Sequence, residues 1–407
     1  MGDGFTSAEK FFSRISGKEA KSGEFVWGEP DLAYMHDILG PLTLDTMRKI
    51  NGDKVKFKGK VVVVNDHIYP PKDSASANNI RNMSDFAVSA GWELIPYGEG
   101  IEHTLLIEKG IIKEGMVVVG TDSHTVTAGS ARSLGIGLGS TDMAALLSLG
   151  KTWFKVPETT IMSVTGKKRK YVTGKDLILK VMSILGTNGA NYRCLEFHIE
   201  KDCTMNSDDD LSIANMTVEA GAKTSIIFNE AIETGSKELK SDSDSNFKEL
   251  KIDISEIEPL IAFPYSPGNI ATVSEYIGKH VDQVYIGNCS NGTISDLREA
   301  AYVLDGKKVK DSVKAIIVPA TRKIYKEAIK EGLVDIFIDA GATVSPPTCG
   351  ACAGLHMGVL AKGEVCVTNI NRNFRGRMGD PESMVYISNT YVAAASAIEG
   401  RITLPGD

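Results

Sequence analysis

Short, unbroken runs of apolar and mostly β-branched residues recur along the chain, bounded by Gly, Asp or Pro. The clearest runs are residues 61–64, 116–119, 284–286, 315–318 and 334–338. A continuous apolar run, as opposed to an alternating one, is typical of a parallel strand buried on both faces. We therefore predict a buried strand at each of these places.

Helical patterns lie between the predicted strands. One begins at Ser295-Asp296-Leu297, and its apolar positions continue at helical spacing to Leu304; another begins at Thr321 and ends at Gly332. A hydroxyl or carboxylate residue at the start and a glycine after the end are the usual helix boundaries. Strand and helix therefore alternate, which predicts an α/β fold.

With 407 residues the chain is too long for one ordinary core, so we expect more than one domain. Residues 236–251 are rich in Ser, Asp and Lys and poor in apolar residues, which predicts a solvated connection before the Pro-rich turns that follow. A weaker boundary is expected at Val156-Pro157. The predicted domains are residues 1–156, 157–262 and 263–407.

Charge and composition exclude several classes of protein. The formal net charge is −7, which argues against nucleic acid as a partner because phosphate binding needs a basic face. No apolar run is long enough for a transmembrane helix, so no membrane association is expected. The first 27 residues lack the hydrophobic core of a secretory signal, and the predicted location is the cytoplasm.

Three of the six cysteines form a candidate metal site. Cys289 follows the predicted strand 284–286, and Cys349 and Cys352 form a C-x-x-C pair in a turn fixed by Pro and Gly. Three thiolates on a four-iron cubane leave one iron without a protein ligand, and that iron can act as a Lewis acid. Cys194, Cys203 and Cys366 are interpreted as buried thiols.

Spacing alone leaves two alternatives open. His356, four residues after Cys352, can complete a Cys₃His zinc site, which would be structural. A thioredoxin-like redox pair fits less well, because this C-x-x-C does not begin a helix after the first strand.

Four of the seven histidines fall early in the chain beside a carboxylate: His36-Asp37, Asp66-His67, Glu102-His103 and Asp122-Ser123-His124. A carboxylate fixes the imidazole tautomer and raises its basicity, as proton transfer requires. Two of these pairs follow predicted strands, at the edge where ligands collect in α/β sheets. His198 and His280 have no such setting and are predicted to be surface residues.

A basic segment follows the cysteine pair and contains Asn371, Arg372, Arg375 and Arg377. Arginine offers paired donors to carboxylates, so this segment predicts binding of an anionic di-acid near the metal. The alternative is a solvated basic loop.

Taken together, these motifs resemble the aconitase family, and within it the isopropylmalate isomerase and homoaconitase branches. The stretches that carry the resemblance are Gly287-Asn288-Cys289-Ser290-Asn291-Gly292, Pro347-Thr348-Cys349-Gly350-Ala351-Cys352 and Asn371-Arg372-Asn373-Phe374-Arg375-Gly376-Arg377. The resemblance covers nearly the whole chain. It implies a three-domain α/β/α architecture around an iron–sulfur cluster, without the family's further swivelling domain.

The resemblance also implies roles for individual residues. Cys289, Cys349 and Cys352 would bind a [4Fe–4S] cluster, and Asp66 and His67 would be the acid/base pair. Positions that match those arranging water or hydroxide near the open iron are His103, Asp122, His124 and Glu196. The substrate-binding positions would be His36, Asp37, Ser123, Asn371, Arg372 and Arg377.

The implied reaction is a reversible dehydration of a hydroxy di- or tricarboxylate. The resemblance points first to 3-isopropylmalate and leucine biosynthesis, with homocitrate or a methyl-substituted malate as alternatives. Thr104, Ser290, Val126 and Ala128 depart from the common isomerase pattern and leave the substrate open. Because the chain ends at Asp407, a separate small subunit is expected to supply the missing domain. The competing hypothesis from another class is a zinc-stabilised binding protein without catalysis.

Overall fold

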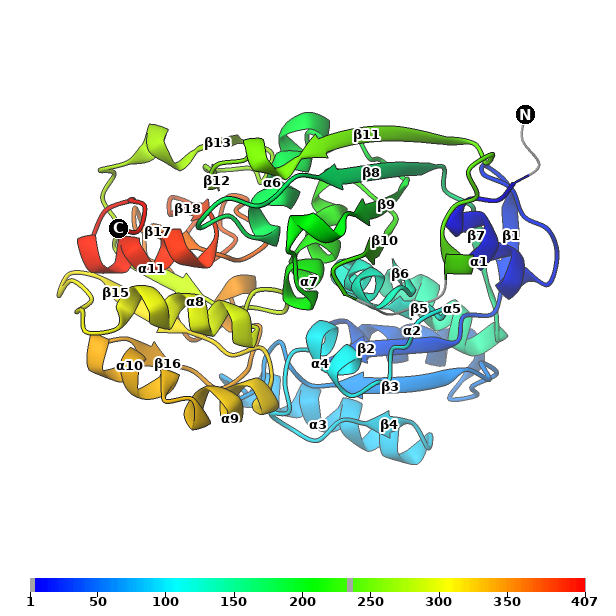
Figure 1. The fold of residues 1–407 in the computed structure, drawn as a ribbon. Coiled ribbons are helices and arrows are strands. Elements are labelled where there is room, and N and C mark those ends of the chain that lie inside the picture. The colour runs from blue at the N-terminus through cyan, green and yellow to red at the C-terminus, as the bar shows by residue number, and fades with distance from the viewer. Residues whose placement is uncertain (1–3, 233–236, 407) are drawn as a thin grey trace.

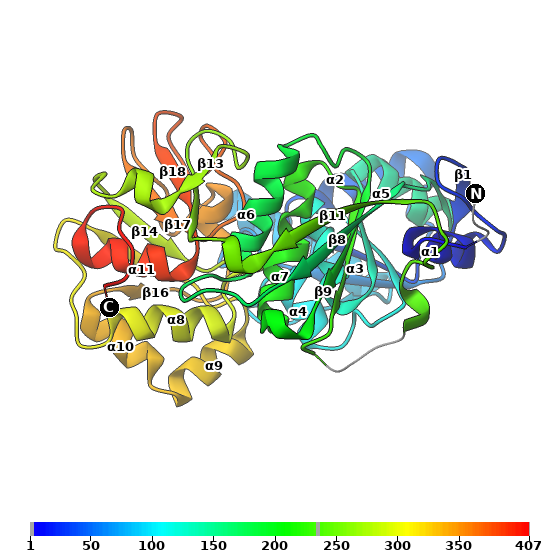
Figure 2. The same cartoon turned by 45° about the horizontal axis from the view of Figure 1, so that its top comes forward.

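The computed structural model describes residues 4–232 and 237–406, which form three largely parallel sheets with helices packed against them (Figure 1). The five-stranded and four-stranded sheets lie in one half of the molecule. The seven-stranded sheet with its helices forms the other half, as the turned view also shows (Figure 2). The α/β prediction is confirmed.

The first sheet is entirely parallel and has the order β4-β3-β2-β5-β6. Its elements and the segments around them are β2 Leu32–His36, α2 Leu39–Asn51, β3 Lys60–Val64, α3 Ser74–Ser89, β4 Glu93–Leu94, α4 Glu102–Glu108, β5 Val117–Gly120, η1 Ser123–Ala131, β6 Leu134–Gly137 and α5 Ser140–Leu149. The predicted strands 61–64 and 116–119 are β3 and, shifted by one residue, β5. Their valines are buried, as expected for central strands.

The second sheet is also parallel, in the order β10-β9-β8-β11. Its elements are β8 Thr159–Thr165, α6 Gly174–Leu185, β9 Cys194–Ile199, η2 Lys201–Cys203, α7 Ser207–Met216, η3 Thr217–Ala220, β10 Thr224–Asn229, η4 Lys237–Leu239, β11 Phe247–Asp253 and η5 Ile254–Glu256. Helix α1 Ser7–Ser16 and the ribbon of β1 Phe25–Gly28 and β7 Thr152–Lys155 lie at its end.

The prediction of a solvated connection over residues 236–251 is wrong for its second half. Ser236 lies outside the described residues, but Phe247–Asp253 forms the edge strand β11, which pairs with β8 over seven residues. Most of β11 is exposed, so its polar composition is that of a sheet edge and not of a loop.

The third sheet has the order β13-β12-β18-β17-β14-β15-β16, parallel except at β12 and β13. Its elements are β12 Leu260–Ala262, β13 Ile270–Thr272, η6 Val273–Tyr276, β14 Gln283–Ile286, α8 Ile294–Leu304, β15 Lys314–Ile317, α9 Arg322–Lys330, α10 Leu333–Ala340, β16 Thr343–Val344, η7 Gly350–Ala353, β17 Val365–Thr368, β18 Met384–Ile387 and α11 Thr390–Glu399. Strands β14 and β15 and helices α8 and α9 confirm the predictions made for them.

The predicted strand 334–338 is wrong, because this segment lies inside helix α10. The buried residues Leu333, Phe337 and Ala340 repeat at helical spacing, whereas Ile338 is 59% exposed. Gly332 and Gly341 bound the helix in the left-handed region, with φ of 75° and 93°. The exposed face of this helix also carries apolar side chains, so the sequence shows an unbroken apolar run. The helical period of its buried residues is therefore not visible in the sequence.

Apolar side chains form several separate cores, one of which joins the second sheet to the cysteine-bearing end of the third. Within the described residues, no helix is both long and apolar enough to cross a bilayer.

Candidate active site

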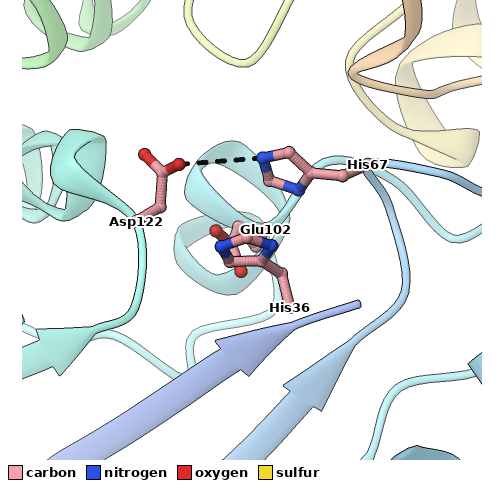
Figure 3. Close-up of side chains that lie close together, drawn as sticks. All are labelled: His36, His67, Glu102 and Asp122. Atoms are coloured by element: carbon pink, nitrogen blue, oxygen red, sulfur yellow. Dashed lines mark ion pairs between the residues drawn. The ribbon is translucent and has the colours of Figure 1, made fainter. Parts of the chain in front are cut away.

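Three neighbouring strands bring the predicted acid/base residues together. In the first sheet β2 lies between β3 and β5, all parallel, so their carboxyl ends share one edge. His36 is the last residue of β2, Asp66 and His67 follow β3, and Asp122 follows β5. Figure 3 shows His36, His67 and Asp122 converging there, with Glu102 beside them.

Asp66 fixes the orientation of His67. Its Oδ1 lies 2.7 Å from His67 Nδ1, and its Oδ2 accepts the backbone N–H of Glu102 at 2.7 Å. Burial lowers the pKa of His67, but Asp66, followed by Cys349 and Asp122, outweighs burial, so the pKa lies well above its usual value. With Nδ1 held by Asp66, Nε2 is the atom free to exchange a proton.

His36 and Asp37 contact the Asp66–His67 pair. The carboxylate of Asp37 accepts the backbone N–H groups of His67 at 3.1 Å and Ile68 at 3.0 Å. The His36 ring stacks on the His67 ring with centroids 4.1 Å apart, and burial lowers its pKa to about 3. Both residues are buried at 2% exposure or less. They therefore contact the Asp66–His67 pair and its neighbours and not solvent.

Asp122 is the centre of a second group of histidines. Its Oδ1 lies 3.2 Å from His103 Nε2 and 3.1 Å from His124 Nδ1, while its Oδ2 lies 3.7 Å from His67 Nε2. Burial raises the pKa of Asp122, but hydrogen bonds from His103, His124 and His67 outweigh burial and hold it well below the usual value. Asp122 is therefore a carboxylate shared by three imidazoles.

The three candidate cysteines lie on the third sheet, facing this group. Cys289 follows β14, and Cys349 and Cys352 flank the start of η7; all three are buried. Asn215 Nδ2 and Asn371 Nδ2 lie 3.2 and 3.4 Å from the Cys289 sulfur. A hydrogen bond shared with Cys349 is the largest cause that lowers the pKa of Cys352 to about 5, and Arg377 adds to it.

Direct contacts join the two sheets across the site. The backbone N–H of Cys349 donates to the carbonyl of Asp66 at 2.9 Å, and the Thr348 hydroxyl donates to the same carbonyl at 3.2 Å. The Thr104 hydroxyl donates to the carbonyl of Cys289. The acid/base pair and the cysteine segment therefore share a fixed spacing.

The basic segment divides between two places. Arg372 donates from Nη2 to Ser123 Oγ at 2.7 Å and from Nε to Glu219 at 2.6 Å, and Arg377 contacts Cys352. The guanidinium of Arg375 instead lies 4.4 Å from the centroid of the Tyr265 ring. Two of the three arginines thus reach the site, as does Asn371.

The structure does not bring Glu196 to this site, which corrects that expectation. Glu196 lies on β9, where its carboxylate binds Ser7 Oγ at 2.6 Å, the Ser241 backbone N–H at 3.0 Å and His198 Nε2 at 2.7 Å. It fastens the N-terminal helix and residue 241 to the second sheet. It therefore has no part in arranging water at the cysteines.

Glu219 holds the place that had been expected for Glu196, and the sequence patterns missed it. Its Oε1 lies 3.0 Å from His124 Nε2 and 2.6 Å from Arg372 Nε. It stands in the short helix η3, far in sequence from every predicted residue that the structure brings to the site and without a neighbouring histidine, so no local pattern marks it. Asn215 and the buried Lys175 were missed for the same reason.

The other histidines have simpler settings. His198 and His280 are exposed in part or largely, as predicted, although each pairs with a carboxylate two residues away, Glu196 or Asp282. His356, the alternative zinc ligand, lies with Nε2 3.3 Å from the carbonyl of His67.

Comparison with known proteins identifies the family of this chain. The model of the aconitase family (aconitate hydratase) matches residues 9–232 and 228–400. The 3-isopropylmalate dehydratase large subunit 2 of Rubrobacter xylanophilus is 46% identical, over 98% of this chain and 97% of its own length. Large subunits from Methanopyrus kandleri and Caldicellulosiruptor saccharolyticus are 42% and 44% identical, over 99% and 100% of this chain and 99% and 98% of their own lengths. The chain therefore belongs to the aconitase family.

Proposed function

We propose that this chain is the large subunit of an iron–sulfur hydro-lyase that reversibly dehydrates 3-isopropylmalate. The observation that carries the proposal is that the Asp66–His67 pair directly abuts the buried cysteine segment through the Asp66–Cys349 contact. The substrate comes from the relatives, whose names specify 3-isopropylmalate dehydratase. Homocitrate and methyl-substituted malates are the alternative substrates.

The ligand set fits a cluster better than a single zinc ion. A structural zinc ion normally needs a fourth protein ligand beside three cysteines. Among the described residues, no three candidate ligand atoms within 4.8 Å of one another combine His356 with Cys289, Cys349 or Cys352. Three buried thiols without a fourth ligand suit a [4Fe–4S] cluster, which would keep one iron open.

A buried lysine supports the same assignment. Lys175 is fully buried, and its Nζ lies 3.3 Å from the carbonyl of Ile370 and 3.4 Å from Asn371 Oδ1. Burial lowers its pKa to about 8, while Asp296, Cys289 and Cys352 raise it. In the described chain no carboxylate forms an ion pair with this ammonium. A buried cation near Cys289 and Cys352 without an ion-pair partner among the described residues suits an anionic group held by these cysteines.

The chain's own residues supply the proton for the departing oxygen. When bound, the cluster would provide a Lewis-acidic iron that polarises the substrate hydroxyl. His67, charged and held at Nδ1 by Asp66, donates its Nε2 proton to that oxygen, and a base of the small subunit would take the proton from the neighbouring carbon, so that water and an alkene form. Asp122 orients His103 and His124 around the same space.

Substrate binding is assigned to the basic segment. Arg377 is largely buried, and its Nε has no hydrogen-bond partner among the described residues, so it has a donor to offer a carboxylate. Arg372 is held by Glu219 with its second nitrogen beside Ser123. Asn371 and Ser123 complete the polar wall. These contacts would orient a dicarboxylate against His67.

The proposal includes a partner and a setting. A separate small subunit would carry the swivelling domain and complete the site, as the relatives' designation "large subunit" suggests. We place the enzyme in leucine biosynthesis and in the cytoplasm, as a heterodimer. We propose domain boundaries near residues 156 and 262. Because β12 pairs with β18 of the third sheet, the second domain boundary falls just before β12.

The decisive experiment is anaerobic reconstitution of the purified chain with iron and sulfide. The proposal expects roughly four irons per chain and broad absorbance near ~400 nm. After addition of the small subunit it expects turnover of 3-isopropylmalate above that of homocitrate and dimethylmalate.

The Cys289→Ala, Cys349→Ala and Cys352→Ala variants should each lose both iron and turnover, whereas Cys366→Ala, a buried thiol outside the site, should keep both. One zinc per chain and no absorbance would instead support the zinc-stabilised binding protein.

A further inference from the structure

Glu102 is a buried carboxyl group that the proposed mechanism does not use. It is the first residue of α4, it is 0% exposed, and neither of its carboxyl oxygens has a hydrogen-bond partner in the described residues. Its Oε1 lies 3.7 Å from His103 Nε2. A carboxyl group removed from water in this way is costly unless it has a specific role.

The side chains around Glu102 belong to the acid/base group. Ligand atoms of Glu102, His36, His67 and Asp122 all lie within 4.8 Å of one another, and Figure 3 shows the four side chains gathered at the ends of the strands. The titratable groups around Glu102 come from every neighbouring element: Tyr34 and His36 on β2, Asp37 after it, Asp66 and His67 after β3, His103 on α4, and Asp122 before η1.

The two ring nitrogens of His36 show that a hydrogen-bond acceptor is missing next to this residue. Its Nδ1 accepts the backbone N–H of Ile38 at 3.3 Å, so the ring proton of the neutral imidazole is on Nε2. That Nε2 is itself buried and has no hydrogen-bond partner in residues 4–232 and 237–406. A protonated Nε2 can donate a hydrogen bond but cannot bind a metal ion, so this corner of the site does not suit a cation.

Asp122, in contrast, lacks a hydrogen-bond donor at one of its two carboxylate oxygens. Its Oδ1 is the oxygen close to His103, His124 and the His124 backbone N–H, whereas its Oδ2 has, within the described part of the chain, only His67 Nε2 at 3.7 Å. Oδ2 can therefore accept one more donor. Burial, followed by repulsion from Asp66, raises the pKa of Glu102 well above its usual value, so a neutral carboxylic acid is the form that fits here.

We propose that Glu102 is a positioning residue which, as a neutral carboxylic acid, accepts a hydrogen bond from His36 Nε2 and donates one to Asp122. A small rotation of the side chain, or one bridging water, closes the remaining distance. Glu102 then fixes the carboxylate that faces His67 Nε2. The kinetic part of this inference rests on the proposed dehydratase function.

Glutamine at position 102 is the discriminating substitution. Glu102→Gln keeps one donor and one acceptor at nearly the same volume but cannot ionise, whereas Glu102→Leu removes both. Glu108→Gln is the matched control, because Glu108 ends the same helix and its Oε2 accepts from the Thr321 hydroxyl outside the site.

The first test needs no activity. Infrared spectra of the full-length chain at neutral pH should contain a carboxylic-acid carbonyl band that disappears in Glu102→Gln and persists in Glu108→Gln. If the Glu102→Gln difference spectrum contains only the bands of an ionised carboxylate, the proposal is wrong. This result is independent of whether the chain dehydrates any malate.

The second test uses the complete enzyme with small subunit and cluster. Glu102→Gln should keep kcat within about threefold at neutral pH, and it should lose the alkaline limb of the kcat profile that ionisation of Glu102 causes in the parent. Glu102→Leu should lower kcat by roughly tenfold to a hundredfold with little change in KM, as for other residues that orient a reacting group. Equal losses in both variants, or a Glu102→Gln profile identical to the parent's, would contradict the role.

Discussion

At the scale of single residues, Glu219 is the side chain that links residues of different sheets at the site. It joins a histidine of the first sheet to an arginine of the third, at 3.0 and 2.6 Å, and only 6% of it is exposed. The second sheet thus contributes a carboxylate that holds the other two together. Its pKa lies below the usual value because hydrogen bonding to His124 and the charge of Arg372 outweigh burial.

We expect Glu219→Gln to lower the free energy of unfolding by about 1–3 kcal/mol, because Arg372 and His124 lose a buried charged partner. Urea denaturation measures this change. Glu158→Gln is the matched control, since Glu158 pairs with Arg193 at 2.5 Å but is 64% exposed, and a change of less than ~1 kcal/mol is expected there. Equal losses of unfolding free energy at the two positions would show that the Glu219 contacts stabilise the fold no more than an exposed ion pair does.

Asp210 gives the chain a predictable dependence on pH. It is buried, accepts from Asn229 Nδ2 at 2.9 Å, and burial raises its pKa to about 7. An unfolded aspartate titrates near pH ~4. Between these values the folded state binds more protons, so the stabilisation from Asp210 is complete below pH ~4 and is lost as pH rises to about 7.

Asp210→Asn should therefore remove part of the fall in stability between pH 5 and 8. The expected gain at pH 8 relative to the parent is about 2–4 kcal/mol, from a shift of roughly three pKa units. Unfolding by urea at several pH values measures it. The same substitution at the exposed Asp45 should leave the pH dependence unchanged; a variant of Asp210 with the parent's slope would contradict the assignment.

At the scale of elements, the Thr321 hydroxyl both caps the start of α9 and contacts the end of α4. The Thr321 hydroxyl oxygen accepts the backbone N–H of Ile324 at 3.1 Å and donates to Glu108 at 2.8 Å. Thr321→Ala should destabilise α9 by about 1–2 kcal/mol, as for other lost N-caps. Hydrogen exchange of the α9 amides measures this, and Thr321→Ser should retain most of the protection.

Elements with one clear period could be predicted from the sequence, and those with two apolar faces could not. The valines of β3 and the capped pattern of α8 each allow one structure. Residues 334–338 are apolar on both faces, so strand and helix could not be separated, although the flanking Gly332 and Gly341 are consistent with helix ends. The edge strand β11 was missed because an edge needs few apolar residues.

The same limit applies to the site. His36, Asp66, His67 and Asp122 could be placed because each follows a recognisable strand. Glu219 and Glu196 are both acidic residues of the middle segment, and only the packing of the second sheet decides which of them faces the cysteines. Long-range contacts of this kind have no local pattern.

At the scale of the whole molecule, the site is a junction between the sheets and should couple ligand binding to folding. Cys349 donates to Asp66 across it, Arg372 reaches Ser123, and Glu219 comes from the sheet between them. A group bound by Cys289, Cys349 and Cys352 binds only the assembled state, because the unfolded chain does not hold these thiols together. Such a group stabilises the fold by mass action.

Reconstituting the cluster should therefore raise the thermal midpoint by roughly 5–10 °C, and removing iron with a chelator should reverse the rise. Anaerobic calorimetry of loaded and unloaded chain measures the increment. Cys289→Ala should abolish the increment, while Cys366→Ala, which alters a buried thiol of β17, lowers both midpoints equally and keeps the difference. The comparison is between the cluster-loaded and unloaded forms of the same variant. A general loss of packing lowers both thermal midpoints and therefore cancels in their difference. An increment that survives in Cys289→Ala would mean that the stabilising group is held elsewhere in the molecule.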